Sequence, residues 1–171
     1  MVESSRGSSA LIPMTWSRRA FVAASLSMSA SALAKPRQRR VPRVLFVCQF
    51  GTAKSAIARE IFRRRASERG VAVTALSRGI TPEDHMTLAL RQRLSAEGID
   101  PTAEVVRALS PRDWQHADIV VIFSPLPPKA KPAHLRDWTD TPSVTDDYAN
   151  ARFVIDRRID ALLDEIAQRS R

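Results

Sequence analysis

The chain has 171 residues, of which 44% are hydrophobic, 26% charged and 6% aromatic. This is the composition of a globular domain, and it excludes a collagen-like or disordered chain. The only cysteine, Cys48, excludes an internal disulfide, and the lack of any run of about 18 apolar residues excludes a polytopic membrane protein. The net charge of +9 favours anionic partners: phosphorylated groups, oxyanions, nucleic acid or an acidic membrane surface.

Residues 1–34 have the features of a bacterial twin-arginine signal peptide. Arg18 and Arg19 form a pair that is followed one residue later by Phe21. A weakly apolar stretch comes next, and it ends in Ala-Leu-Ala at residues 32–34, the small-x-small pattern that signal peptidase cleaves. We therefore expect the export machinery to carry the protein to the periplasm, with cleavage after Ala34. The alternative is an N-terminus that is never cleaved.

Residues 35–42 (KPRQRRVP) form a basic linker with two prolines. Nucleic-acid-binding arms combine basic residues with aromatic side chains that stack on bases, and this stretch has none. The stretch is therefore interpreted as a solvated tether, and no nucleic-acid partner is expected. The alternative is a basic adaptor that uses residues 35–43 to bind an anionic surface.

The next 35 residues predict a strand followed by a helix. A continuous apolar run at residues 44–47 stops at Cys48, which is typical of a parallel strand buried on both faces. One face of the predicted helix carries Ala58, Ile61 and Phe62. The arginines at residues 63–65 continue this helix as a solvated face, and Gly70 ends it.

Strands and helices continue to alternate to the end of the chain. Residues 71–76 and 118–123 are the second and third predicted strands, and four prolines exclude regular structure between residues 125 and 132. The second helix ends at Gly98 and has its apolar positions at Met86, Ala89, Leu90 and Leu94. The last helix has them at Ile155, Ile159, Leu162, Leu163 and Ile166. This alternation predicts an α/β domain whose parallel sheet is covered on both faces.

The strongest functional signal is the predicted strand–helix junction at Cys48. Binding sites of parallel sheets form in the loops that leave the carboxyl ends of the strands. A short loop before a helix directs backbone N–H groups and the helix dipole at an anion, and this field favours a thiolate. Ser55 can donate a hydrogen bond to that thiolate, and Lys54 supplies a cation for a tetrahedral oxyanion. The pattern predicts a thiolate nucleophile; the alternative is a small buried cysteine.

Residues 44–60 (VLFVCQFGTAKSAIARE) resemble the low-molecular-weight protein tyrosine phosphatases and the arsenate reductases that share their fold. The similarity continues through residues 77–79 (SRG), 94–100 (LSAEGID), 109–121 and 138–142, and it covers about residues 43–168. It implies that residues 43–168 form a low-molecular-weight phosphatase-like domain. The implied fold is a flavodoxin-like three-layer α/β sandwich with a four-stranded parallel sheet and helices on both faces.

The resemblance also implies the site residues. The catalytic residues are Cys48, Lys54, Ser55 and Asp140, and the oxyanion-binding loop consists of Gln49, Phe50, Gly51, Thr52, Ala53 and Lys54. Three departures from the family pattern stand out: Lys54 replaces an arginine and so loses its planar fork, Gly51 replaces an asparagine, and Thr141 separates Asp140 from the following proline. Weaker candidates for the general acid are Asp137, Asp146 and Asp147.

These residues predict a cysteine-dependent phosphatase that hydrolyses phosphomonoesters, with phosphotyrosine as the leading substrate, through a cysteinyl-phosphate. Its partner is a phosphorylated protein or a small phosphomonoester, and no metal or other cofactor is expected, since His85, His116 and His134 lack ligand spacing. One alternative is a degenerate module that binds phosphate or another oxyanion without turnover. Another is an arsenate reductase that relies on an external thiol, because Ser124 stands at one of the further cysteine positions such an enzyme uses. The oligomeric state stays open.

Overall fold

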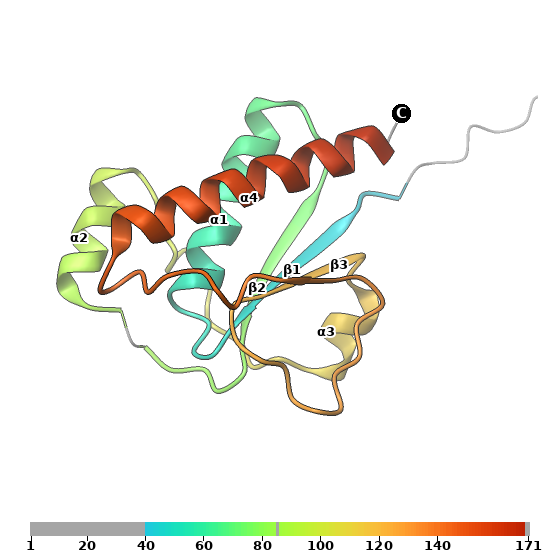
Figure 1. Cartoon of the computed structure of the whole chain (residues 1–171), viewed down its shortest axis with the longest axis horizontal. Coiled ribbons are helices and arrows are strands. Elements are labelled where there is room, and N and C mark those ends of the chain that lie inside the picture. The colour runs from blue at the N-terminus through green and yellow to red at the C-terminus, as the bar shows by residue number, and fades with distance from the viewer. Residues whose placement is uncertain (1–39, 85, 170–171) are drawn as a thin grey trace, which may run out of the picture. The chain divides into compact units, whose positions relative to one another are not determined.

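The structure is a computed structural model that describes residues 40–84 and 86–169 (Figure 1). The predicted signal peptide, residues 35–39 of the predicted linker, and His85 lie outside the described residues. Within the described ranges, no helix combines the length and the apolar character that crossing a bilayer requires.

Four parallel strands form one sheet in the order β2-β1-β3-β4. The strands are β1 (Arg43–Cys48), β2 (Thr74–Gly79), β3 (Ile119–Ile122) and β4 (Leu135–Asp137). β1 is central, and its pairing with β2 ends at Cys48 opposite Gly79. Its residues 44–48 are all buried, as the apolar run predicts. The cysteine thus ends the strand that is most enclosed by the sheet.

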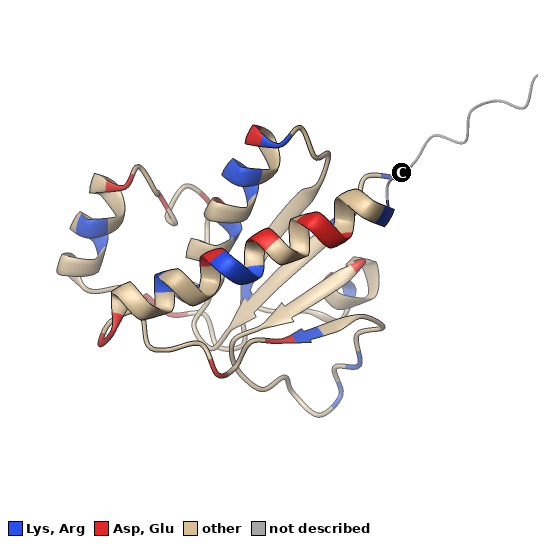
Figure 2. Ribbon diagram, turned by 45° about the horizontal axis from the view of Figure 1, so that its top comes forward, with Lys and Arg blue, Asp and Glu red and all other residues tan. Residues whose placement is uncertain are grey.

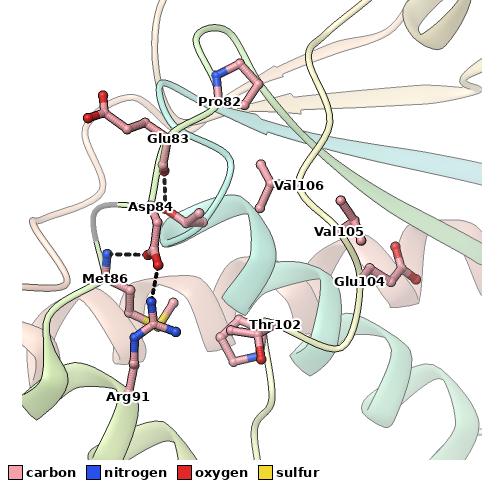
Figure 3. Close-up of a pocket in the computed structure, with 11 residues that line it drawn as sticks. Pro82, Glu83, Asp84, Met86, Arg91, Thr102, Glu104, Val105 and Val106 are labelled. Atoms are coloured by element: carbon pink, nitrogen blue, oxygen red, sulfur yellow. Dashed lines mark hydrogen bonds and ion pairs between the residues drawn. The ribbon is translucent and has the colours of Figure 1, made fainter.

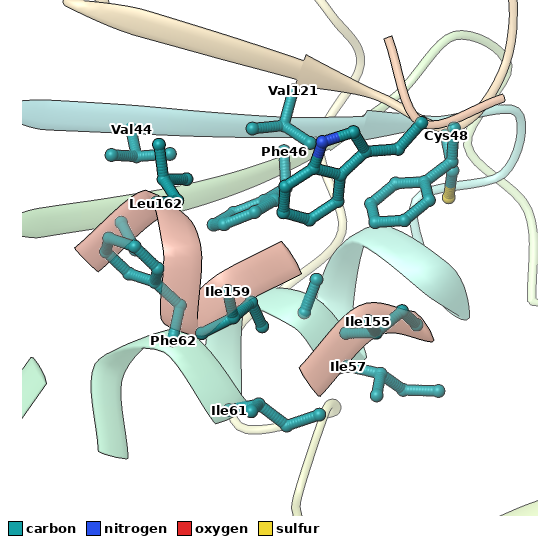
Figure 4. Packing of buried hydrophobic residues seen from close by; sticks show 14 of the residues in the cluster. Val44, Phe46, Cys48, Ile57, Ile61, Phe62, Val121, Ile155, Ile159 and Leu162 are labelled. Carbon is teal, nitrogen blue, oxygen red and sulfur yellow. The ribbon is translucent and has the colours of Figure 1, made fainter. Parts of the chain in front are cut away.

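Helices cover both faces of this sheet (Figure 1). They are α1 (Lys54–Glu68), α2 (Leu88–Ala96), α3 (Pro111–His116) and α4 (Tyr148–Arg169). Side chains of α1, α2 and α4 share one core cluster with Val44, Phe46 and Val121 of the sheet (Figure 4). Trp114 of α3 packs on the other face, against a cluster that includes Leu45 and Val120. The three-layer α/β sandwich is therefore confirmed.

Aromatic side chains link the cysteine strand to the segment that follows β4. Phe46 packs edge-on against Phe62 of α1, with ring centroids 5.5 Å apart. Its other aromatic neighbour is Trp138, at 6.2 Å, and Trp138 also packs edge-on against Phe123 at 5.7 Å. Edge-to-face aromatic pairs add to the free energy gained from burying their apolar area. Trp138 thereby fixes the start of residues 138–142 beside the carboxyl ends of β1 and β3.

The second strand begins three residues later than the sequence predicts. Residues 71–73 complete the exit from α1: Gly70 has a positive φ of 64°, and the Val71 amide donates to the Ala66 carbonyl over 2.9 Å. The strand prediction for residues 71–76 is wrong in its first half, because these apolar residues close a helix end. The prediction that Gly70 ends the helix is confirmed.

Two short elements have no counterpart among the elements predicted from periodicity. β4 has only three residues, none of them buried, so it gives no apolar pattern. α3 has six residues and begins at a capping box between Ser110 and Asp113, with Pro111 in the first turn. Neither element is long enough for hydrophobic periodicity to reveal it.

The arginines of α1 differ from the predicted solvated face. Arg65 is half-buried and forms ion pairs with Asp156 at 2.9 Å and Asp160 at 2.7 Å, both on α4. Arg63 reaches Glu104, and only Arg64 is exposed. Figure 2 shows basic and acidic residues intermingled along α4, where the partners of Arg65 lie. Arg63 and Arg65 are therefore paired with acidic residues of the domain, and the predicted solvated face is wrong for both.

Candidate active site

The candidate site lies where the strand order reverses direction. The chain passes from β1 to β2 on one side and later returns to place β3 on the other side of β1. Loops that leave β1 and β3 therefore diverge and leave a crevice at the carboxyl edge of the sheet. Cys48 ends β1 at this edge, and Phe123 and Ser124 follow β3 there. The sequence prediction for the position of Cys48 is confirmed.

The sulfur of Cys48 is held by two groups of its own loop, residues 48–55. The Gly51 amide donates to Sγ over 3.1 Å, and Ser55 Oγ lies 3.0 Å from Sγ. Ser55 is fully buried, whereas Cys48 retains 6% of its exposure. A thiolate accepts hydrogen bonds only, so in that state the Ser55 hydroxyl is the donor. Both contacts stabilise negative charge on the sulfur.

The same loop leads into the uncapped N-terminus of α1. The residue before the helix is Ala53, and no side chain caps the first turn. The first amides of a helix have no acceptor inside it, and the helix dipole places partial positive charge there. This end of α1 favours a bound anion next to the sulfur, as the oxyanion-loop prediction requires.

Two glycines allow the 48–55 loop to lie against the end of β2. Gly51 has a φ of 78°, and a Cβ on it would come within 2.7 Å of both the Gly79 amide nitrogen and Val106 Cγ1. A Cβ on Gly79 would lie 2.7 Å from the Phe50 carbonyl group. Only glycine fits at both positions, because the two backbones touch. Gly51 is therefore required by sterics as well as by its φ.

Backbone hydrogen bonds extend this contact past the strands. The amides of Ile80 and Thr81 donate to the carbonyls of Cys48 (3.1 Å) and Gln49 (2.9 Å). Further on, the Glu83 amide donates to the Phe50 carbonyl over 3.2 Å. The first three residues of the loop are thus paired with the segment that follows β2.

A cavity of about 350 Å³ opens beside the sulfur. Its lining consists of Cys48, Gln49, Phe50, Ala53, Lys54, Phe123, Ser124, Ser143, Val144 and Thr145. The first five were predicted as site residues; Phe123 and residues 143–145 were not. Gly51 and Thr52 of the predicted loop do not line this cavity. The Gln49 amide, predicted to bind an oxyanion, donates to Ser124 Oγ over 3.1 Å.

Lys54 stands between the sulfur and residues 138–142. Its Nζ donates to the Thr141 carbonyl over 2.5 Å. Burial lowers the pKa of Lys54, while the charges of Cys48 and Asp140 oppose that change. The lysine thus interacts electrostatically with two of the other predicted catalytic residues, Cys48 and Asp140, and it lines the cavity as expected.

Asp140, the predicted proton donor, forms an ion pair. Its two carboxylate oxygens accept hydrogen bonds from Arg158 of α4 over 2.8 Å and 2.7 Å. This arginine holds the pKa of Asp140 below its ordinary value, with a smaller contribution from Lys54. Asp140 does not line the cavity at Cys48. Sequence reasoning missed Arg158, because an arginine on a charged helix face reads as solvated.

A second and larger cavity is not lined by Cys48 (Figure 3). It measures about 480 Å³ and lies between residues 82–86 and 101–106. Thr52 lines it, and its hydroxyl donates to the Glu83 carbonyl over 3.1 Å. Size alone therefore does not identify the site, because five of the predicted site residues line the smaller cavity. Over residues 40–84 and 86–169, no three His, Cys, Asp or Glu side chains are grouped to hold a metal ion.

Comparison with protein families gives one match, over residues 43–127, to the family described as low molecular weight phosphotyrosine protein phosphatase. No curated protein sequence matches the chain. Among solved structures, YfkJ from Bacillus subtilis is 20% identical, with a TM-score of 0.64 over 78% of this chain and 99% of that one.

Two further solved structures are similar. A low molecular weight phosphotyrosine phosphatase from Vibrio cholerae O395 is 18% identical, with a TM-score of 0.61 over 75% of this chain and 98% of that one. A thioredoxin-dependent arsenate reductase from Corynebacterium glutamicum is 25% identical, with a TM-score of 0.57 over 81% and 66%. These likenesses confirm the predicted fold.

Proposed function

The chain belongs to the family of low-molecular-weight phosphotyrosine phosphatases and arsenate reductases, and from this premise we propose that it hydrolyses phosphomonoesters, aryl phosphates such as phosphotyrosine foremost, through a phosphoryl group carried on Cys48. The observation that supports this most directly is the sulfur geometry. Sγ lies 3.1 Å from the Gly51 amide and 3.0 Å from the Ser55 hydroxyl, beside an uncapped helix N-terminus. A buried structural cysteine needs none of these donors.

The reaction proceeds in two displacements at phosphorus. In the first, the Cys48 thiolate forms a P–S bond, and the bond from phosphorus to the ester oxygen breaks. In the second, a water oxygen forms a P–O bond and loses a proton, the P–S bond breaks, and inorganic phosphate leaves. Asp140 is the residue we assign to proton transfer in this reaction.

Positive charge on the phosphoryl oxygens comes from the loop and from Lys54. In this proposal the first amides of α1 lie against an anion bound next to the sulfur. The Gln49 and Gly51 amides already donate to Ser124 and to the sulfur. Lys54 supplies a point charge, whereas an arginine at this position would grip two oxygens at once. Phe50 and Phe123 both line the cavity and give an aromatic leaving group an apolar wall.

This proposal is tested with the full chain, p-nitrophenyl phosphate and a metal chelator in excess. We expect release of phosphate by the wild type and a loss of at least about 10³-fold in the Cys48→Ser variant, because removing a nucleophile removes the whole covalent route. Turnover that survives in Cys48→Ser would contradict the proposal.

A second candidate function is phosphate binding without turnover. Two residues that depart from the family pattern favour it, because both are already bound to other groups. Lys54 donates to the Thr141 carbonyl, and Asp140 is paired with Arg158. The same assay separates the two functions when combined with calorimetric titration of inorganic phosphate. Binding of phosphate with no hydrolysis of the aryl ester would establish the binding module.

Arsenate reduction is the third candidate, and it needs a reductant from outside the chain. Cys48 is the only cysteine, and Ser124 accepts a hydrogen bond from the Gln49 amide where a resolving thiol would be needed. Arsenate-dependent oxidation of added glutathione or thioredoxin would support it. We expect the wild type to oxidise neither thiol faster than the Cys48→Ser variant does.

We also propose that residues 1–34 direct export to the periplasm. Support comes from the arginine pair at Arg18 and Arg19 and from the cleavage pattern that ends at Ala34. N-terminal sequencing of the protein recovered from a bacterial periplasm tests this. The expected first residue is Lys35, and an intact Met1 in the cytoplasmic fraction alone would contradict export.

A further inference from the structure

Arg158 of α4 makes four contacts with the 138–142 segment. It donates to both carboxylate oxygens of Asp140, at 2.8 Å and 2.7 Å, and to Thr141 Oγ1 at 3.0 Å. Its guanidinium carbon lies 5.8 Å from the centre of the Trp138 ring. Most surface ion pairs contribute little to stability, but a bidentate arginine–carboxylate pair is an exception.

The segment is held from the other side by Lys54 of α1. The Lys54 ammonium donates to the Thr141 carbonyl, while the Thr141 hydroxyl donates to the Trp138 carbonyl over 2.7 Å and accepts from Arg158. Thr141 is 3% exposed, so it is the buried centre of this network. The two cations thus bind one turn from two helices, Lys54 from α1 and Arg158 from α4.

The charged groups that act on Asp140 come from three elements. Arg158 of α4 and Lys54 of α1 are positive, and both favour the carboxylate form. Asp137, at the end of β4, is negative and opposes them, but its own carboxylate is occupied by Thr139 over 2.7 Å and 2.9 Å. The balance of charge around Asp140 therefore favours its ionised form.

We propose that Arg158 is a positioning residue that keeps Asp140 a carboxylate, so that at neutral pH Asp140 accepts the proton of the attacking water but does not protonate the departing oxygen. This inference rests on the proposed function. The first displacement then proceeds only with leaving groups that depart as anions, which take their proton from solvent. In the second displacement the Asp140 carboxylate takes the water proton as the P–S bond breaks, and it returns that proton to solvent.

The consequence is a steep dependence on the acidity of the leaving alcohol. Nitrophenol departs readily as an anion, phenol less so, and an alkyl alcohol hardly at all. Well above the pKa of an acid, its protonated fraction rises tenfold for each unit by which that pKa rises. Removing Arg158 should therefore accelerate the reaction of a poor leaving group, which no purely structural role predicts.

The test compares the full-length wild type with Arg158→Gln, Arg158→Lys and Arg157→Gln. Arg157 is the matched control, because it is the neighbouring arginine on α4 and its guanidinium lies over the Phe153 ring, 5.8 Å from its centre. The side chain of Asp140 is 71% exposed, so the Gln variant leaves no buried charge and should fold. For each protein, kcat/KM is measured with p-nitrophenyl phosphate and phenyl phosphate, and the Asp140 carboxyl is titrated by carbon NMR.

In Arg158→Gln we expect a higher pKa of Asp140, a several-fold rise in kcat/KM for phenyl phosphate at neutral pH, and little change for p-nitrophenyl phosphate. Arg158→Lys should lie between wild type and Gln, since it keeps the charge but loses the fork. Arg157→Gln should match wild type.

The outcomes separate the inference from the proposed function. An unshifted pKa of Asp140 in Arg158→Gln, or an equal fall in kcat/KM for both substrates, would overturn the role of Arg158. A shifted pKa without turnover in any of the proteins would overturn the proposed hydrolysis and the part of the inference that rests on it.

Discussion

The two sides of the candidate site are built in different ways. The 48–55 loop is held by its own groups and by a neighbouring backbone: Gly51 and Ser55 both contact the Cys48 sulfur, and the loop backbone pairs with residues 80–83. The 138–142 segment is held by side chains of two helices, since Asp140 is bound by Arg158 and Thr141 by Lys54. The proposed nucleophile is therefore held by its own loop, while the proposed proton-transfer residue is paired with an arginine of α4.

This difference indicates which variants should affect all substrates and which should affect only some. The 48–55 loop is fixed by glycine contacts and strand pairing, so changes there should affect every substrate. The 138–142 segment is held by side chains on two helices, so changes there should affect proton transfer and depend on substrate and pH. The predictions below follow this contrast, in order of their effect on kcat/KM.

Replacing Gly51 with alanine should have the largest effect on kcat/KM. The Cβ of alanine would lie 2.7 Å from the Gly79 amide nitrogen and from Val106 Cγ1, and the alanine would have to adopt a φ of 78°. We expect the free energy of unfolding to fall by about 3 kcal/mol and kcat/KM to fall by more than about 100-fold, because a displaced loop misplaces the nucleophile. Urea denaturation and steady-state kinetics measure these losses.

Gly98→Ala is the control for that change. Gly98 also has a positive φ of 64°, but the nearest atom to a new Cβ is the flexible end of Arg64 at 3.6 Å. Here only the backbone conformation opposes alanine, at a cost of about 1 kcal/mol. We expect unchanged kcat/KM. Equal losses of activity in the two variants would show that the 48–55 loop is not special.

Ser55→Ala should lower kcat/KM by about 10–100-fold for both aryl phosphates. The variant removes the hydroxyl 3.0 Å from the sulfur and leaves the Gly51 amide in place. Ser124→Ala is the comparison, because Ser124 lines the same cavity but contacts the Gln49 amide. A larger loss in Ser124→Ala than in Ser55→Ala would contradict the assignment of Ser55 to the sulfur.

Asp140→Asn should separate kcat from kcat/KM. For p-nitrophenyl phosphate, kcat/KM reports events up to release of the nitrophenol, and it should stay within about 3-fold of wild type because that leaving group needs no proton. The second displacement loses its base, so kcat should fall by about 10²-fold. Stopped-flow kinetics should then show a burst of nitrophenol. Equal falls in kcat and kcat/KM would place Asp140 in the first displacement.

Tyr148, at the start of α4, tests a region away from the site. It is the only tyrosine; burial and the hydrogen bond to Glu97 at 2.8 Å raise its pKa to about 12. The unfolded chain loses this proton at pH about 10, so the stabilising contribution is complete below pH 10 and is lost as the pH rises to about 12. Ultraviolet titration measures the pKa directly.

In Tyr148→Phe, the free energy of unfolding should fall by about 1 kcal/mol. The activity should not change, because Tyr148 bonds to Glu97 and lies under Arg93, whose guanidinium is 5.0 Å from the ring centre. A loss of activity would show that the α2–α4 contact reaches the site.

The strand–helix junction at Cys48 could be predicted from the sequence because its signals are local. The apolar run before Cys48 and the spacing to Ser55 depend on consecutive residues, and so does the period of α4. β4 and α3 are too short for periodicity, and residues 71–73 were read as a strand although they close α1. α3 and the end of α1 depend on single turns that carry no hydrophobic period, whereas β4 forms only by pairing with β3, which is distant in sequence.

The outer half of the site could not be predicted, for the same physical reason. Arg158 lies on a charged face of α4, and only the fold brings it beside Asp140, which precedes it by 18 residues in the sequence. Likewise, Phe123 and Ser143 reach the cavity from two separate loops. The spacing of Thr141 between Asp140 and the next proline was visible in the sequence, but its burial between two cations was not.

The central claim is that Cys48 carries the phosphoryl group. The most direct measurement is acid quenching of the full chain during turnover of p-nitrophenyl phosphate, followed by mass spectrometry of its peptides. We predict a phosphoryl group on the peptide that contains Cys48. Its level should be higher in Asp140→Asn than in wild type, and Arg157→Gln should match wild type. Steady turnover with no phosphorylated Cys48 in either wild type or Asp140→Asn would contradict the account.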